Sequence, residues 1–345
     1  MSQNLKLGNF IKKPRFWVWG IFFLLLAAAG YFLYLNRAEL SDILRQADLR
    51  WAIPAVVSAF ASLILAGLGY ALVGKIIKMP APFGEATMVG FLTIAMNHIF
   101  TTGNAVGFAV RILFLKKWGV KPKEVVMMSL IHSYVNNIVF IFLLPLSIIY
   151  AFRAGVIPGP SWIEGAALFV FVVLVLFVTG IVFSSRFSRR VIAAVVKLAR
   201  KFSNETLPQH IGEIEDKLEE YRNLIKSDPK TLVLAIGIIA VDWAFTIFCL
   251  YFCLKALGLY SPLVAVGAGF FISVLIGELS MIPGGFGSED AVLILFFSRL
   301  GLSAAGLILV VGLFRIVYYL LPFLAALLIY FKEGRKLGDD LASIS

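Results

Sequence analysis

The ionisable side chains inside long apolar segments are the residues best suited to chemistry in this sequence. They are two arginines and four carboxylates, namely Arg111, Arg315, Asp242, Glu278, Glu289 and Asp290. A charge within a membrane segment is costly and by default marks a ligand or ion site. The arginines are suited to holding an anionic group. The carboxylates are suited to balancing those arginines, accepting a cationic group or taking a proton.

Each arginine also has a simpler interpretation that the sequence leaves open. Arg111 lies five residues before Lys116, which is close enough for its side chain to extend to the inner headgroups. Arg315 lies about 17 Å into its apolar segment, where such an extension is hard. A buried ion pair with Asp242 or Glu289 is the alternative role for Arg315.

No pattern for bond-making chemistry accompanies these charges. The three histidines have no second ligand at metal-binding spacing, and the two cysteines, in one apolar segment, are interpreted as packing residues. "GFGS" departs from the G-x-S-x-G nucleophile motif, and nucleotide-binding glycine motifs are absent. We therefore expect no catalytic residue, no metal and no cofactor. An integral-membrane transferase ranks third among the functions considered.

Two clusters of helix-breaking residues interrupt the apolar sequence, "TTGNAVG" at 101–107 and "MIPGGFGSED" at 281–290. Irregular backbone survives in hydrocarbon only beside protein or a watery cavity, so both breaks indicate a polar or protein-lined centre. Each also begins a half-helix whose free N–H groups suit an anion. Close helix packing at glycine is the alternative. The candidate residues of the first break are Gly103, Asn104 and Gly107, and Asn104 or Thr102 is its helix cap. The candidate residues of the second break are Pro283, Gly284, Gly285, Gly287 and Ser288, and Ser288 is its helix cap.

Composition places these segments in a membrane. Hydrophobic residues make up 60% of the 345 residues and charged residues 15%, against about 25% in soluble domains. The net charge of +11 comes mostly from residues between the apolar windows, so it indicates topology and argues against nucleic acid as a partner. Six windows approach the length of about 20 apolar residues that spans a bilayer: 16–35, 51–74, 125–150, 162–183, 231–254 and 304–331.

Lys and Arg give the orientation, because short cytoplasmic loops are enriched in both. This rule places the N-terminus and the C-terminus in the cytoplasm, and the first window is interpreted as an uncleaved anchor in preference to a signal peptide. The basic segments assigned to the cytoplasm are the N-terminus, 75–78, 116–123, 184–230 and 332–336.

The region 85–115 begins and ends beside cytoplasmic basic clusters. Its arms, 86–99 and 104–115, are about 21 and 18 Å long and too short to span alone. We therefore expect a re-entrant hairpin entered from the cytoplasm, with 262–300 as its counterpart from outside. The predicted fold class is an all-α polytopic membrane protein with about six spanning helices and two re-entrant helical hairpins in an inverted repeat.

The whole chain, 1–345, is expected to form a single integral membrane domain. Its inverted halves are 51–150 and 231–331, each reading span, hairpin, span. Between them, 184–230 is expected to be a cytoplasmic amphipathic segment. Its ordinary role is a surface helix on the bundle or headgroups, and its alternative role is a docking site for a partner.

The sequence resembles the lysylphosphatidylglycerol synthase transmembrane-region family over roughly 10–335. "MIPGGFGSED" carries the resemblance most specifically, together with Arg315 before "VYYLLP" and Asn97 before Gly103, Gly107 and Arg111. The family includes the flippase half of bifunctional proteins that aminoacylate phosphatidylglycerol and move it across the membrane. The resemblance implies a membrane role for Asn97, Gly103, Gly107, Arg111, Pro283, Gly284, Gly285, Gly287, Glu289, Arg315 and Pro322.

The sequence departs from this family in two places. Thr101 and Thr102 occupy a region where the family commonly carries a proline. The sequence also ends at Ser345 with no aminoacyl-transferase domain, so we do not expect it to make aminoacyl lipid by itself.

Two functions from different classes fit these patterns. The first is a lipid flippase or transporter of the cytoplasmic membrane, in which Arg111 and Arg315 bind an anionic, aminoacylated or polyprenyl-phosphate lipid between hairpins that open alternately to each leaflet. The second is a non-transporting accessory subunit that docks a lipid- or glycan-modifying enzyme through 184–230. Membrane lipids are the expected partners, and either function is compatible with an oligomer.

Overall fold

The described residues form helices and no strands. This computed structural model describes residues 37–99, 105–160, 227–280 and 282–342, with Tyr34, Asn223 and scattered positions between 162 and 177. The all-helical class is confirmed. The predicted span 16–35 apart from Tyr34, about half of the predicted span 162–183, and nearly all of 184–230 with its docking role lie outside the described residues.

Four stretches of the described chain are long and apolar enough to cross a membrane. They match four of the predicted spans to within a few residues, so the chain is a multi-pass membrane protein. The four stretches are Leu49–Ile76, Pro122–Arg153, Pro229–Ala256 and Ala304–Gly334.

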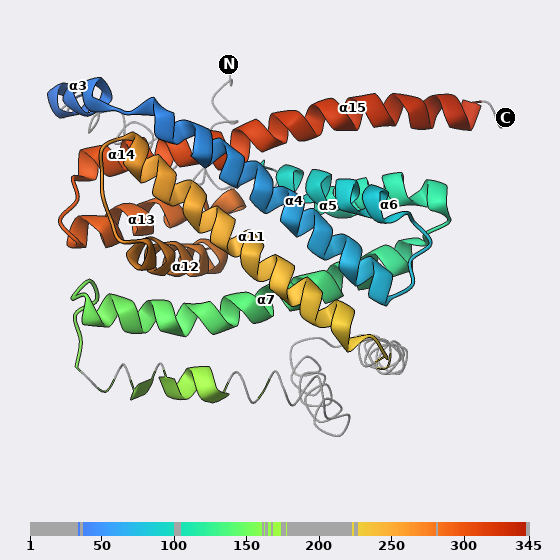
Figure 1. Cartoon of the computed structure of the whole chain (residues 1–345), viewed down its shortest axis with the longest axis horizontal. Coiled ribbons are helices and arrows are strands. Elements are labelled where there is room, and N and C mark those ends of the chain that lie inside the picture. Colours follow the sequence, from blue (N-terminus) through green and yellow to red (C-terminus); the bar gives the residue numbers. More distant parts are fainter. Residues whose placement is uncertain are drawn as a thin grey trace, which may run out of the picture.

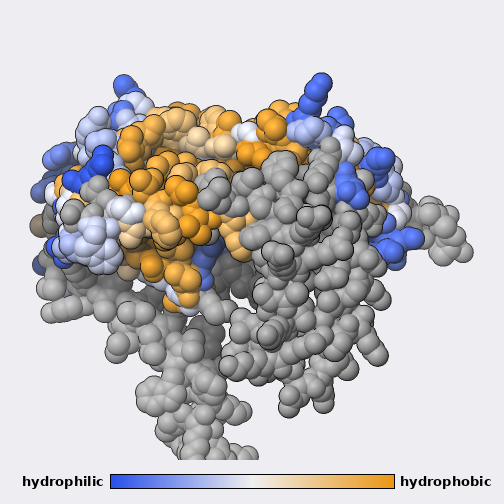
Figure 2. All heavy atoms as spheres, turned by 90° about the horizontal axis from the view of Figure 1, so that it is seen from below, coloured by the Kyte–Doolittle hydropathy of each residue, from blue (hydrophilic) through white to orange (hydrophobic). Residues whose placement is uncertain are grey.

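The outer surface of the bundle is apolar. Figure 2 shows hydrophobic residues in a band across one face, with hydrophilic residues gathered at both ends. Large exposed apolar side chains include Leu130 and Leu146 on α7 (Pro122–Arg153) and Val233 on α11 (Pro229–Ala256). A patch of this size would promote aggregation in water, whereas facing lipid is its ordinary state.

Two long helices, α4 and α11, lie side by side along the centre of the molecule, and a pair of shorter helices lies toward each end of them (Figure 1). The short helices have 11 to 17 residues, about 16–25 Å, which is less than the ~30 Å hydrocarbon core. Helix α7 contacts both long helices and one member of each pair. The bounds are α4 Ala52–Ile76, α5 Phe83–Ile99 and α6 Ala105–Leu115 for the first pair, and α12 Leu263–Leu279 and α13 Ser288–Arg299 for the second.

The last helical stretch is not uniform. It begins as α14 (Ala304–Phe314), widens to a π-helix over Arg315–Leu320 and continues as α15 (Leu321–Ala342). A π-helical turn is rare and often lies at a functional site. It carries Arg315, Tyr318 and Tyr319, and both tyrosines are buried. Helix α3 (Arg37–Gln46) contacts α14 from the connection that precedes α4.

Helix α11 begins with a side-chain cap. The carboxylate of Asp228 accepts hydrogen bonds from the hydroxyl of Thr231 at 2.6 Å and from its backbone N–H at 3.1 Å. These hydrogen bonds hold the pKa of Asp228 below its usual range. Pro229 follows at the first helical position, where a missing N–H costs nothing. The cap and the proline fix where the central helix starts.

Helices α4 and α5 approach each other at glycines. A Cβ atom on Gly67 would lie 2.5 Å from the carbonyl oxygen of Thr87, and one on Gly90 would lie 2.8 Å from the Cα of Gly67. Backbone atoms of α5 cannot move aside as a flexible side chain can. The glycines therefore set the distance between the central helix and the first short pair.

Replacing Gly67 with alanine is expected to destabilise the protein by about 1–3 kcal/mol, because the added methyl group overpacks against backbone. Thermal unfolding in detergent measures the effect. Gly237→Ala on α11 is the matched control, since a Cβ there meets nothing within 4 Å. The control should be neutral or slightly stabilising, as alanine favours a helix over glycine. Equal changes in both variants would contradict the close approach.

Candidate functional site

The ends of the two short helix pairs meet inside the bundle. His98, near the end of α5, packs its ring against Tyr318 and Tyr319, with ring centroids 5.2 and 5.0 Å away. A Cβ on Gly284, in the loop between α12 and α13, would lie 3.1 Å from the carbonyl oxygen of His98. The end of α5, just before the first sequence break, and the loop of the second break are thus neighbours beside the π-helical turn.

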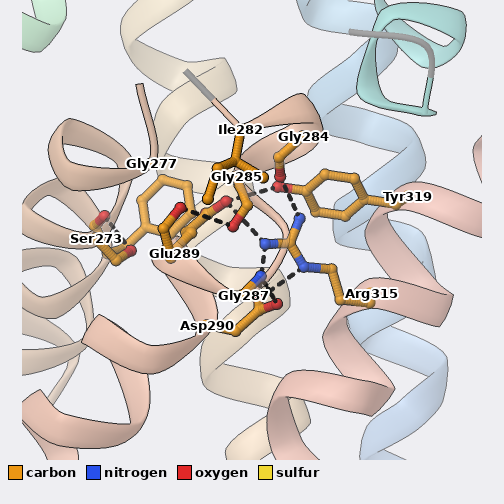
Figure 3. A network of polar contacts seen from close by, with 12 residues as sticks. Ser273, Gly277, Ile282, Gly284, Gly285, Gly287, Glu289, Asp290, Arg315 and Tyr319 are labelled. Atoms are coloured by element: carbon orange, nitrogen blue, oxygen red, sulfur yellow. Dashed lines mark hydrogen bonds and ion pairs between the residues drawn. The ribbon is translucent and has the colours of Figure 1, made fainter. Parts of the chain in front are cut away.

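An ion cluster centred on Arg315 occupies this position (Figure 3). Its guanidinium pairs with Glu289 at 3.0 Å and with Asp290 at 2.7 Å, and its Nη1 donates to the carbonyl of Gly284 at 2.9 Å. Tyr319 donates to the same Glu289 oxygen at 3.2 Å, and its ring lies 4.2 Å from the guanidinium carbon. The charge of Arg315 is therefore matched by two carboxylates. Of the two mates considered for Arg315, Glu289 is in contact and Asp242 is not.

The loop before α13 has a backbone that glycine makes possible. Gly284, Gly285 and Gly287 all have positive φ angles, of 63°, 61° and 85°. The Gly287 N–H donates to the carboxylate of Asp290 at 2.9 Å. Gly287 therefore occupies the N-cap position of α13 that was predicted for Ser288. Ser288 instead bonds to Ser280 at 2.9 Å and closes the loop onto α12.

A second polar cluster surrounds Asp242 in the middle of α11. The hydroxyl of Ser62 on α4 donates to its carboxylate at 2.5 Å. Ser62 also lies 2.9 Å from the hydroxyl of Thr246 and 3.3 Å from that of Tyr318, and these two hydroxyls are 3.0 Å apart. Asp242 and the three hydroxyls of this cluster join α4, α11 and the π-helical turn.

The first helix pair is closed by a side chain of its own. Asn97 on α5 accepts a hydrogen bond from the backbone N–H of Gly107 at 3.0 Å, which satisfies a donor near the start of α6. A Cβ on Gly107 would lie 2.5 Å from the Asn97 amide nitrogen, so this glycine also serves packing. Gly103 and Asn104, with the caps expected there, lie outside the described residues.

Arg111 occupies a third place, between α4, α6 and α7. It is 8% exposed, donates to the hydroxyl of Ser129 and stacks over the ring of Tyr70 at 4.4 Å. His132 packs edge-on against the same ring at 5.6 Å. The Nε of Arg111 and the Nε2 of His132 are buried without a hydrogen-bond partner in the described part of the chain. No ion pair of the described residues includes Arg111, and its side chain is buried in the bundle.

The predicted site residues thus separate into groups. Glu289, Gly284, Gly285, Gly287 and Arg315 come together, while Asp242 and Arg111 each lie in a cluster of their own. Glu278 is exposed near the end of α12 and belongs to none of the three clusters. Sequence reasoning missed several residues of these clusters, for which the only signal was a polar group or tyrosine on an apolar helix. They include Ser62, Tyr70, Ser129, Thr246, Tyr318 and Tyr319.

Comparisons with known proteins give one family. The model of the lysylphosphatidylglycerol synthase TM region matches residues 17–326. A UPF0104 membrane protein of Methanothermobacter thermautotrophicus is 24% identical over 289 residues, or 81% of this chain and 84% of that protein. The phosphatidylglycerol lysyltransferase of Staphylococcus aureus is 26% identical over 272 residues, or 78% of this chain and 28% of that enzyme.

The corresponding enzyme of Staphylococcus xylosus is 24% identical over 293 residues, or 83% of this chain and 30% of the enzyme. The chain therefore spans less than a third of the lysyltransferases that it matches, and most of the archaeal membrane protein.

Proposed function

Because the chain belongs to the family of the lysylphosphatidylglycerol synthase TM region, we propose that it is a lipid flippase or lipid transporter of the cell membrane. The substrate class is an anionic or aminoacylated phospholipid or a polyprenyl-phosphate lipid. The observation that carries the proposal is the meeting of the end of α5 with the loop of the second break, beside the ion cluster of Arg315. Lipid tails can slide along the apolar surface, whereas a charged headgroup needs such a polar interior to cross.

The order of the helices supports an inverted repeat as the framework for this movement. A long helix, a short pair and a long helix follow one another in 51–150, and again in 231–331. We propose that α5–α6 enters from the cytoplasm and α12–α13 from outside, with both chain ends in the cytoplasm. Alternating exposure of the interior to the two leaflets then requires the two short pairs to separate in turn.

The two arginines have different roles in this proposal. Arg315 is neutralised by Glu289 and Asp290, so it holds the second break closed until a headgroup competes for it. Arg111 has no carboxylate in the described chain, and a buried cation left uncompensated is strongly unfavourable. A lipid phosphate would supply the missing charge and accept from the free Nε.

Arg111→Gln is expected to slow lipid translocation at least about tenfold, the equivalent of ~1.4 kcal/mol in the barrier. Thermal stability should stay equal or rise, because the substitution removes a buried unpaired charge. The measurement is movement of labelled lipids in reconstituted vesicles, alongside thermal unfolding of the purified variant.

Arg45→Gln, an exposed arginine on α3, is the control and should translocate like the unaltered protein. Arg111→Gln that loses stability and keeps translocation would make Arg111 a structural residue. A rate no higher than that of empty liposomes, across phospholipids and polyprenyl-phosphate lipids, would refute the proposed function itself.

A further inference from the structure

We infer that Asp242 is a proton-binding site that couples lipid movement to a proton gradient; this inference rests on the proposed function. Asp242 is 9% exposed and lies about 20 Å from either end of α11, at the middle of a membrane-crossing helix. Among the described residues its carboxylate has one hydrogen-bond partner, the hydroxyl of Ser62, and none of their ion pairs includes it. A carboxylate in this position must either be neutralised or stay charged at a large cost in free energy.

The hydrogen atoms of the cluster favour the neutral acid. Ser62, Thr246 and Tyr318 supply three hydroxyl hydrogens. The oxygens nevertheless make five contacts at hydrogen-bond distance. Ser62 contacts the Asp242 carboxylate, the Thr246 hydroxyl and the Tyr318 hydroxyl. Thr246 also contacts the Tyr318 hydroxyl and the backbone carbonyl of Asp242. A proton on Asp242 supplies a fourth hydrogen and lets its O–H donate to Ser62. The hydroxyl of Ser62 is then free to donate to Thr246 or Tyr318.

A proton suits these oxygens better than a divalent metal ion. Their separations of 2.5–3.3 Å are those of hydrogen bonds. Asp242 is the only carboxylate among them, so the cluster would balance only one of the two charges of a Ca²⁺ or Mg²⁺ ion, which proteins usually hold with carboxylates. The cluster therefore favours a proton as its ligand.

The groups that face Asp242 leave it as the acid of the cluster. Helix α14 carries no titratable side chain, and the only carboxylate of α12, Glu278, is exposed. The charged groups Arg315 and Glu289 contact Tyr319, the chain neighbour of Tyr318. The remaining titratable neighbours are Tyr318 on the π-helical turn, His98 of α5 against the face of Tyr318, Cys249 on α11, and His132 of α7, near Gly69 and Ile239.

The π-helical turn links this cluster to the Arg315 cluster. Tyr318 bonds into the Asp242 cluster, and its chain neighbour Tyr319 bonds to Glu289, the partner of Arg315. His98 packs against both tyrosines. Loss of the proton makes Ser62 donate to the carboxylate and removes one of the four hydrogens that Asp242, Ser62, Thr246 and Tyr318 share. The turn that carries Arg315 therefore experiences the protonation state of Asp242.

Infrared spectroscopy tests the proton directly. The purified protein at neutral pH should show the C=O stretching band of a protonated carboxyl group, and Asp242→Asn should lose it. Tyr318→Phe should shift the band by removing one hydroxyl of the cluster, which gives a second readout if Asp242→Asn fails to fold. A wild-type spectrum without such a band overturns the inference, whatever the translocation assay shows.

Proteoliposomes test the coupling. An imposed pH gradient should accelerate lipid translocation by the wild-type protein, and Asp242→Asn should lose that acceleration. Asp228→Asn, which makes the same substitution at the start of the same helix and keeps a capping side chain, should retain it. A gradient response preserved in Asp242→Asn overturns the inference and leaves the proposed function standing. If Asp242→Asn removes the infrared band but the wild-type protein does not translocate lipid, the proton site is supported and the transport function is refuted.

Discussion

Replacing Arg315 with leucine is expected to destabilise the protein by about 3–5 kcal/mol and to abolish lipid translocation. The guanidinium holds the buried carboxylate of Glu289 and the half-buried carboxylate of Asp290, and removing one partner of a buried ion pair leaves the other charge uncompensated. The leucine variant also loses the hydrogen bond to the Gly284 carbonyl, which fixes the loop before α13. Thermal or chemical unfolding in detergent and translocation in vesicles measure the two effects.

A matched pair separates burial from charge. Lys117→Ala removes an ion pair with Glu85 in which both side chains are about a quarter exposed, and it should cost less than about 1 kcal/mol of stability.

Adding Glu289→Gln and Asp290→Asn to Arg315→Leu removes the two anions that lost their partner, so part of the lost stability should return while translocation stays absent. Arg315→Leu with wild-type stability would show that the cluster does not hold the loop.

The general architecture was predictable because a membrane constrains it strongly. Twenty-residue apolar windows located four long helices to within a few residues, and the glycine and proline clusters located the breaks. Depth within the final helix and the carboxylates near the second break identified Arg315 as a residue needing a partner. Glu289 was one of the two candidates, and it is the one in contact.

Contacts between distant segments were not predictable in this way. Ser62 bonds to Asp242 across 180 positions of the sequence, and neither helix has a polar stripe that marks a shared face. The cap at Gly287 depends on three left-handed glycines, whose conformation brings Asp290 and not Ser288 to the N–H. The π-helical turn also has no sequence signal, yet it positions Tyr318 and Tyr319 toward different clusters.

The environments of the two arginines explain why the sequence alone left their roles open. Both look alike as single cations in apolar sequence. Arg315 lies among carboxylates that come from the adjacent helix start, whereas Arg111 lies on a tyrosine ring beside a serine and a histidine. Arg315 is therefore paired with carboxylates, whereas Arg111 has no anionic partner in the described chain. Packing decides this difference.

Gly285→Ala is expected to lower stability by more than the ~1–2 kcal/mol that left-handed backbone costs an alanine, and to abolish translocation. Gly285 has a φ of 61°, and a Cβ there would lie 2.9 Å from the Glu289 oxygen that binds Arg315. The new methyl group must displace that oxygen, which breaks the ion pair and the hydrogen bond from Tyr319. Unfolding and vesicle translocation again provide the measurements.

Gly258→Ala is the control that isolates the displacement of Glu289. Gly258 has a φ of 72° at the end of α11, and a Cβ there meets nothing within 4 Å. It should show the cost of left-handed backbone alone and translocate normally. If both variants lose the same stability and Gly285→Ala still moves lipid, the loop does not position Glu289 through Gly285. A larger loss in Gly285→Ala, with translocation abolished only there, is the result that the geometry of the cluster requires.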